Sequence, residues 1–313
     1  MAFEVLQREK RPPALKRCSF GCLQGLHALN VTNGCGHCCV YCYARGYQQA
    51  PPKGQVELYV NLPELLAEEL DNPRRRVRPC LVVFNTASDC FQPHPEVQRV
   101  TYRTIEVLLK RGIRISFLTK GVIPRDTLEL LGERPELVRA QVGLVSLSPW
   151  YWRTFEPGAA SPEERLKVIE DLQGVGIRPE VRIDPIIPFV TDAEEDIRAL
   201  LKALRDLGVK RVSMSYLHLR PAIADNLKGE LGEMWTRIEL PYRNQPWRTV
   251  GTSTRSKLIP LPLRRRGYER IKGMARSLGM EAVICSCKNP DLQGELCIPP
   301  SWRVEGPRQL SLF

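Results

Sequence analysis

The stretch Asn33-Gly-Cys-Gly-His-Cys-Cys-Val-Tyr-Cys-Tyr-Ala-Arg45 governs how the rest of this 313-residue chain is interpreted. Cys35, Cys39 and Cys42 follow a C-x3-C-x2-C spacing. Three thiolates on one tight loop can ligate three irons of a cubane cluster and leave the fourth iron open for a small molecule. The alternatives are inert thiols or a zinc site that includes Cys38, but adjacent Cys38 and Cys39 would strain one tetrahedral centre. The spacing therefore favours an iron–sulfur site.

Further motifs accompany this loop: Ser88-Asp89, Leu118-Thr-Lys120, Arg125-Asp126 and Asp184-Pro-Ile-Ile-Pro188. Together with Cys39-Val-Tyr-Cys-Tyr43 they resemble the radical S-adenosylmethionine (SAM) enzymes, and within them the spore photoproduct lyase branch, often labelled DNA repair photolyases. The resemblance implies a 4Fe–4S cluster on the three cysteines, SAM as cofactor and a 5′-deoxyadenosyl radical. It also implies an electron donor such as flavodoxin or ferredoxin.

Composition is that of a large soluble domain with a basic surface. The chain is 43% hydrophobic, carries a formal charge of +11 and shows no apolar run of membrane-spanning length, so we expect a cytoplasmic protein without a membrane partner. An excess of Lys and Arg favours a polyanionic partner such as DNA. The densest basic clusters, Arg74-Arg-Arg-Val-Arg78 and Arg264-Arg-Arg266, could contact phosphate or be solvated faces.

Strand-like apolar runs alternate with helical patterns, which predicts successive βα units around a parallel sheet. The expected strands are 29–32, 80–84, 113–117, 142–147, 180–187 and 209–216, with a short one at 281–284. Periodicity alone allows a doubly wound sheet or an eight-fold barrel, whereas the resemblance implies a partial (β/α)6 TIM-like barrel with a C-terminal extension. The expected divisions are an N-terminal extension at 1–28, the barrel at 29–221, the extension at 222–298 and a tail at 299–313.

Helix signals are clearest in four places. Short helical patterns cover 63–70 and 95–110, the second ending at Gly112. Ser161 and Glu164 form a capping box, which would place Leu166, Ile169 and Leu172 against the sheet, and Thr191 with Glu194 repeats the device. Beyond residue 221 we expect helices at 222–240 and 268–278, the second preceded by an irregular Pro, Arg and Gly-rich stretch.

The resemblance also implies roles for individual side chains. Tyr41 and Tyr43 would lie near the adenosine or the radical path, although they could simply pack beside the cluster. Strand-end side chains would bind SAM, with packing, capping or ion pairing as the structural alternatives; they are Lys120, Ser146, Ser148 and Arg182, the last of which could also pair with Asp184.

One position departs from the family pattern. Spore photoproduct lyases carry a cysteine shortly before the Ser-Asp pair, and its thiol returns a hydrogen atom to the product; Thr86 stands there in this chain. An alcohol O–H is much harder to break homolytically than a thiol S–H. Cys90 is the replacement donor that the sequence offers, or else a small buried hydrophobe.

Two features lie near the C-terminus. Cys285, Cys287 and Cys297 could hold an auxiliary iron–sulfur cluster or zinc, with Cys18 or Cys22 as a fourth ligand. Gln309-Leu-Ser-Leu-Phe313 resembles the peptide by which bacterial polymerases and repair proteins bind the sliding clamp, unless this tail folds back on the core.

The resemblance and the basic charge together predict a radical SAM enzyme that repairs DNA, and a carbon–carbon lyase of DNA lesions is the reaction that the resemblance implies. Two alternatives remain open. The same chemistry could act on RNA, a peptide or a small molecule, or the chain could be a non-enzymatic iron–sulfur or zinc protein that binds DNA.

Overall fold

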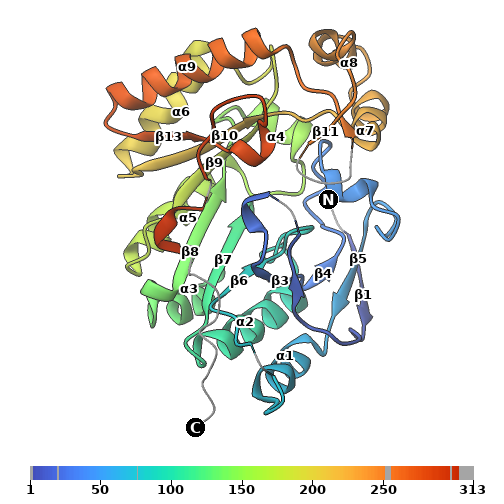
Figure 1. The fold of residues 1–313 in the computed structure, drawn as a ribbon, viewed down its shortest axis with the longest axis vertical. Coiled ribbons are helices and arrows are strands. Elements are labelled where there is room, and N and C mark those ends of the chain that lie inside the picture. The colour runs from blue at the N-terminus through green and yellow to red at the C-terminus, as the bar shows by residue number, and fades with distance from the viewer. Residues whose placement is uncertain (1–2, 20, 76, 251–254, 297, 303–313) are drawn as a thin grey trace.

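The computed structural model describes residues 3–19, 21–75, 77–250, 255–296 and 298–302. Its main unit is a sheet in the strand order β13-β10-β9-β8-β7-β6-β3-β2 (Figure 1). Every neighbouring pair is parallel except β2 with β3. The strands are β2 (Lys16–Arg17), β3 (His27–Leu29), β6 (Leu81–Phe84), β7 (Arg114–Thr119), β8 (Val138–Gly143), β9 (Glu180–Ile186), β10 (Arg211–Tyr216) and β13 (Glu281–Ile284). This mostly parallel, open sheet confirms the partial barrel.

Helices connect and cover these strands. They are α1 (Leu62–Asp71), α2 (Pro95–Leu109), α3 (Arg125–Gly132), α4 (Pro149–Phe155), α5 (Pro162–Gly174), α6 (Glu194–Asp206), α7 (Pro221–Leu231), α8 (Met234–Glu239) and α9 (Leu261–Ser277). α2 lies where the helical pattern predicts and buries Val97, Ile105, Leu108 and Leu109, and Gly112 takes a positive φ just beyond its end. Strands β6 and β8 are buried along their whole length, as expected for parallel strands covered on both faces.

A smaller sheet joins the N-terminus to the region around the cysteine loop. β1 (Glu4–Arg8) pairs parallel with β5 (Gln55–Tyr59), and β5 pairs antiparallel with β4 (Thr32–Asn33), which ends immediately before the loop. A separate hairpin pairs β11 (Arg248–Thr249) with β12 (Arg255–Ser256). Strand β3 spans the expected boundary at residue 28, and the expected C-terminal extension supplies β13. Both extensions are therefore built into the main sheet (Figure 1).

Two predicted strands differ from the observed ones. The segment predicted at 142–147 is β8, which begins and ends four residues earlier. Its first half was missed because Arg139 and Gln141 are polar, yet both are buried and donate hydrogen bonds to Glu180. The predicted strand 29–32 is split, because β3 pairs with β6 whereas β4 pairs with β5.

Some helices also differ from the prediction in where they begin or in which residues they bury. The capping box of α5 is confirmed, but Arg165 shares its buried face and Leu166 is only partly buried. α6 has Ala193 as N-cap, because the Thr191 hydroxyl accepts a hydrogen bond from the Ile187 N–H instead. α9 begins at Leu261, not at 268, since proline is tolerated in a first turn. Inside it, a Cβ at Gly267 would lie 2.0 Å from the Tyr216 hydroxyl.

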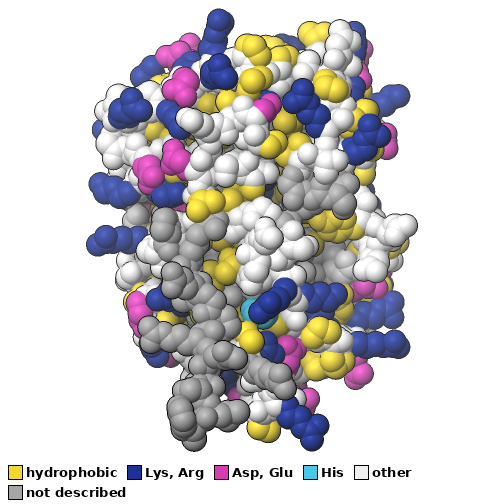
Figure 2. All heavy atoms as spheres, in the orientation of Figure 1, with side chains coloured by type: hydrophobic (Ala, Val, Ile, Leu, Met, Phe, Trp, Pro, Cys, Tyr) yellow, Lys and Arg dark blue, Asp and Glu magenta, His cyan; other side chains and the backbone are white. Residues whose placement is uncertain are grey.

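Charge is spread over the surface. On the face shown in Figure 2, Lys and Arg side chains are interspersed with Asp and Glu and do not form one patch. Arg264 of the second basic cluster is buried and bonded to Asn289 and Asp291, so it supports the fold. No helix in the described ranges is both long and apolar enough to cross a membrane.

Candidate functional site

A cavity of about 390 Å³ opens where the carboxyl ends of the parallel strands meet. Residues that follow β3, β6, β7, β10 and β13 line it, and inward-facing side chains of β8 and β9 complete its wall. Ligands bind at this end of parallel α/β sheets because the loops and strand ends converge there. The volume is within the range of small-molecule and cofactor sites.

The cysteine loop is held on this rim by close backbone contacts. The Val40 N–H donates to the Phe155 carbonyl, and the Gly158 N–H donates to the His37 carbonyl. A Cβ at Gly36 would lie 2.2 Å from the Phe3 ring, and one at Gly158 would lie 2.3 Å from the Gly36 carbonyl oxygen. Only glycine fits these two contacts, which press the loop between the N-terminal segment and the turn after α4.

All three cysteines of the spacing line the cavity, whereas Cys38 lines only a neighbouring pocket. Burial raises the pKa of Cys39 to about 12. The pKa of Cys35 is also raised, mainly by burial and to a smaller extent by the negative charge of Asp89. Such thiols need a positively charged partner to ionise. Within the described ranges these three sulfurs do not form a set compact enough for a single ion. In a cubane each thiolate binds its own iron, so its three ligands need not lie that close together.

Asp89 joins three of the sequence motifs. Its carboxylate accepts hydrogen bonds from the Thr119 hydroxyl at 2.8 Å and from the Lys120 N–H at 2.8 Å. It also lies 3.4 Å from Nδ1 of His37, within the cysteine loop. The Ser-Asp and Leu-Thr-Lys motifs are therefore parts of one junction that fixes the loop relative to β7.

A buried network lies behind the loop. Tyr41 donates its hydroxyl hydrogen to Glu156, and Glu156 pairs with Arg165 at 2.5 Å; both charged groups are only 1% exposed. The Lys120 ammonium lies 5.6 Å from the centre of the Tyr41 ring. Burial is the largest single influence and lowers the pKa of Lys120, but the charges of Glu156, Cys39 and Asp184 together outweigh it and raise that pKa. Lys120 therefore presents a stable cation to the cavity.

A second charged group closes the opposite wall. Asp184 accepts hydrogen bonds from Arg182 at 2.9 Å and from Lys288, which follows β13. Burial opposes ionisation of Asp184, yet the two cations lower its pKa well below the usual range. Burial, then Lys288, lowers the pKa of nearby His218 to about 3, so this imidazole is neutral.

Two residues that line the cavity have a buried side-chain nitrogen without a partner in the described part of the chain. The side-chain oxygen of Asn85 accepts a hydrogen bond from the Val31 N–H, but its buried amide nitrogen has no partner within the described ranges. The same holds for Nε2 of His37. Both residues line the cavity. Because buried polar groups are normally hydrogen-bonded, these two atoms are suited to a bound cofactor.

The structure brings together most of the side chains expected to act. Tyr43 lines the cavity, donates to the Thr86 carbonyl and lies under the Arg220 guanidinium at 5.0 Å. Tyr41, Thr86, Lys120 and Arg182 line it as well.

Other expected residues lie elsewhere. Ser148 caps α4 by accepting the Tyr151 N–H, and Ser146 accepts the Ser148 N–H; neither is among the lining residues described. Cys90 is fully buried in the main hydrophobic core, and the described lining does not include it. The ribose-binding and hydrogen-donor roles stay predictions.

Sequence reasoning gave no role to Glu156, His37, Asn85 or Lys288. A lone glutamate after a tryptophan-rich helix, or a lysine 104 residues from its aspartate partner, carries no local pattern. His37 lies within the cysteine motif, and Asn85 directly precedes Thr86. Both follow the end of a strand, and this position is the signal that could identify them.

Comparison with known proteins gives a family. Residues 29–204 match the model of the Radical SAM superfamily. An uncharacterised protein of Acidianus two-tailed virus is 27% identical over 241 residues, covering 69% of this chain and 79% of the viral one. A radical SAM Nalpha-GlyT isomerase of Pseudomonas phage M6 is 25% identical over 261 residues, covering 81% of this chain and 51% of the phage protein.

Solved structures agree on the fold. A spore photoproduct lyase mutant with bound AdoMet and dinucleoside spore photoproduct matches with a TM-score of 0.63 over 89% of this chain and 81% of the lyase, at 16% identity. At that identity the likeness extends to the architecture and not to the substrate.

Proposed function

The chain belongs to the radical SAM superfamily, and from this premise we propose that it acts on DNA, as a repair enzyme similar to spore photoproduct lyase. Membership implies a 4Fe–4S cluster and SAM as cofactors. The observation that carries the radical chemistry is the cavity, which is lined by the three spaced cysteines, by a cation at a strand end and by two residues with unpartnered buried nitrogens.

Cys35, Cys39 and Cys42 would hold the cluster, which together with SAM supplies a 5′-deoxyadenosyl radical. The protein supplies position and exclusion of water. Lys120 would pair with the carboxylate of SAM, since its charge is fixed by Glu156 and it lines the cavity. Asn85 and His37 would hydrogen-bond polar groups of the bound cofactor through their unpartnered nitrogens.

Three observations support DNA as substrate. By analogy of fold, the spore photoproduct lyase structure that matches this chain carries a dinucleoside photoproduct. The formal charge of +11 favours a polyanion, and Arg220 lines the cavity beside Tyr43. Tyr43, 40% exposed at the cavity, offers an aromatic face on which an unpaired base could stack.

Thr86 favours a second candidate reaction. A lyase that draws its returning hydrogen from a thiol needs a cysteine at this position, and Cys90 lies in the core. In an isomerisation, the hydrogen taken from the substrate can return to the rearranged product, so no thiol donor is required. The name of the phage relative agrees with that outcome.

The test is formation of 5′-deoxyadenosine by anaerobically reconstituted, reduced enzyme. We expect ultraviolet-irradiated duplex DNA to stimulate it more than undamaged duplex or RNA of the same sequence. The variant Thr86→Cys distinguishes the two reactions, because it should increase lyase product only if a thiol donor is what the wild type lacks. Equal stimulation by RNA, or none by any nucleic acid, would refute the DNA proposal.

A further inference from the structure

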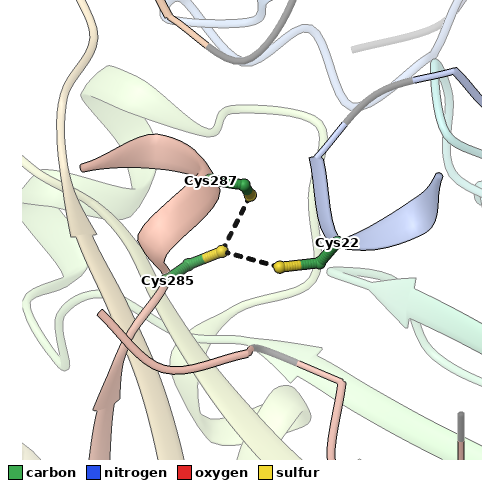
Figure 3. Close-up of side chains that lie close together, drawn as sticks. All are labelled: Cys22, Cys285 and Cys287. Carbon is green, nitrogen blue, oxygen red and sulfur yellow. Dashed lines mark hydrogen bonds between the residues drawn. The ribbon is translucent and has the colours of Figure 1, made fainter. Parts of the chain in front are cut away.

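Three cysteines from the two ends of the chain meet beside the cavity (Figure 3). Cys22 lies on the short helix η1 (Gly21–Leu23), Cys285 follows β13, and Cys287 lies on η5 (Ser286–Lys288). The Cys285 sulfur lies 3.3 Å from that of Cys22 and 2.8 Å from that of Cys287. All three sulfurs lie within 4.8 Å of one another, which brings Cys22 next to residues 263 and 265 positions further along the chain.

The spacing of the sulfurs favours one ion. Thiolates bound tetrahedrally to a single Zn²⁺ at about 2.3 Å lie roughly 3.8 Å apart, a separation that small side-chain rotations reach from here. A cubane would place each thiolate on its own iron and spread them further. A disulfide would use only two of the sulfurs, whereas Cys285 lies next to both others.

The surroundings of these sulfurs also suit a metal. Cys22 and Cys285 are 6% and 2% exposed and pack against Ile298, with Leu23, Leu26 and Trp302 around them. Thiolates in such an apolar place need a bound cation, and soft sulfur ligands select zinc among the common structural metals. Cys18, the other candidate from the N-terminal segment, lies in a different apolar cluster with Ala28 and Val83.

The backbone is shaped for this contact. Gly21 has φ +50°, and a Cβ there would lie 2.8 Å from Cβ and 2.9 Å from Sγ of Cys287. A Cβ at Gly294 would lie 2.4 Å from Cα of Ser286. Cys285 also forms an isolated bridge with Glu295. Because only glycine allows these two close approaches, three chain segments pack closely around the sulfurs.

We propose that Cys22, Cys285 and Cys287 bind one Zn²⁺ that joins the N-terminal segment to the segment after β13, with a water molecule from the cavity as its fourth ligand. Cys22 and Cys287 both line the cavity, and Lys288, the next residue, donates to Asp184, which also lines it. The ion thereby fixes the wall that faces the cysteine loop. Cys297, the third cysteine expected here, lies outside the described residues and is not part of the proposal.

The test is metal analysis of the full chain after reconstitution. Wild type should hold one zinc besides the four irons and four sulfides of the cubane. Cys285→Ser should lose the zinc and keep the iron and sulfide, whereas Cys39→Ser should lose the cubane and keep the zinc. The matched control is Cys18→Ser, a buried cysteine of the same segment outside the group, which should keep both. Failure of the zinc proposal is thus separable from failure of the proposed function.

A second measurement covers the case in which Cys285→Ser does not fold. Wild type grown with Co²⁺ in place of zinc should show sulfur-to-cobalt charge-transfer absorption, and Cys287→Ser, at a half-buried site, should lose most of it. Zinc that persists in both serine variants would overturn the proposal. Wild type that holds no zinc would also overturn it. This applies to a protein with eight irons and equally to one with only the four irons of the cubane.

Discussion

Glu156 is a buried anion that holds the cysteine loop through Tyr41. It accepts the Tyr41 hydroxyl, pairs with Arg165 and balances Lys120. Removing one partner of a buried pair leaves the other charge uncompensated, at a cost of about 3–5 kcal/mol. We expect Glu156→Gln to lower the free energy of unfolding by that amount and to reduce retention of the cluster, both measured by denaturant titration followed at the cluster absorbance.

The control for that substitution is Glu129→Gln. Glu129 pairs with Arg125 at 3.0 Å on an exposed helix face, where an ion pair contributes only about 0–1 kcal/mol. If both variants lose equal stability, the Glu156 network does not anchor the loop.

Lys120 tests how the cofactor is positioned. Its ammonium lines the cavity, and loss of a charged hydrogen bond costs about 1.5–3 kcal/mol. Lys120→Met should therefore raise the dissociation constant of SAM roughly ten- to a hundred-fold with cluster content unchanged. Lys110→Met, on an exposed lysine paired with Glu106, should leave it unchanged. Equal affinity in Lys120→Met and wild type would assign the lysine to packing alone.

The sequence identified residues with a local signature and missed residues whose partners are distant. Cys35, Cys39 and Cys42 could be predicted because their spacing lies within eight residues. Glu156 could not, since its partners Tyr41 and Arg165 become neighbours only after folding. Cys22 was one of two equal candidates until the fold placed it beside Cys285.

Short helix η1 and its glycine control the contact between the chain ends. A methyl group at Gly21 would meet Cys287, and φ +50° costs a non-glycine residue about 1–2 kcal/mol. Gly21→Ala should speed loss of zinc to a chelator by about ten-fold. Gly229→Ala, with nothing within 4 Å of the added Cβ, is the matched control and should not change it. An unchanged rate in Gly21→Ala would mean that η1 does not carry a ligand.

Most elements could be predicted because their apolar pattern agrees with their burial. α2 and the strands β6, β7, β9, β10 and β13 lie where expected to within two residues. The sequence predicts β8 four residues too late, because its polar residues are buried by hydrogen bonds to Glu180. It predicts too short an α9, because the Pro, Arg and Gly-rich stretch before residue 268 is typical of irregular structure, whereas Gly267 packs against Tyr216 inside the helix. In both cases a contact distant in sequence overrides the local signal.

For the whole molecule, the terminal peptide Gln309–Phe313 lies outside the described residues, and its clamp-binding role stays a proposal. Deleting these five residues should abolish binding to a bacterial sliding clamp in a pull-down and leave SAM cleavage intact, because the cavity residues lie elsewhere in the chain. Leu312→Ala with Phe313→Ala is the variant of matched length and should behave in the same way. Clamp binding that persists after the deletion would exclude the peptide.

Anaerobic SAM cleavage by Cys39→Ser and Cys38→Ser, compared with wild type, tests the account most directly. These neighbours differ in position, since Cys39 is buried and lines the main cavity, whereas Cys38 is half-buried and lines only the adjoining pocket. With a chemical reductant, wild type and Cys38→Ser should contain four irons and four sulfides and form 5′-deoxyadenosine, and Cys39→Ser should form none. A wild-type protein that holds no inorganic sulfide, or a Cys39→Ser variant that cleaves SAM as fast as wild type, would contradict it.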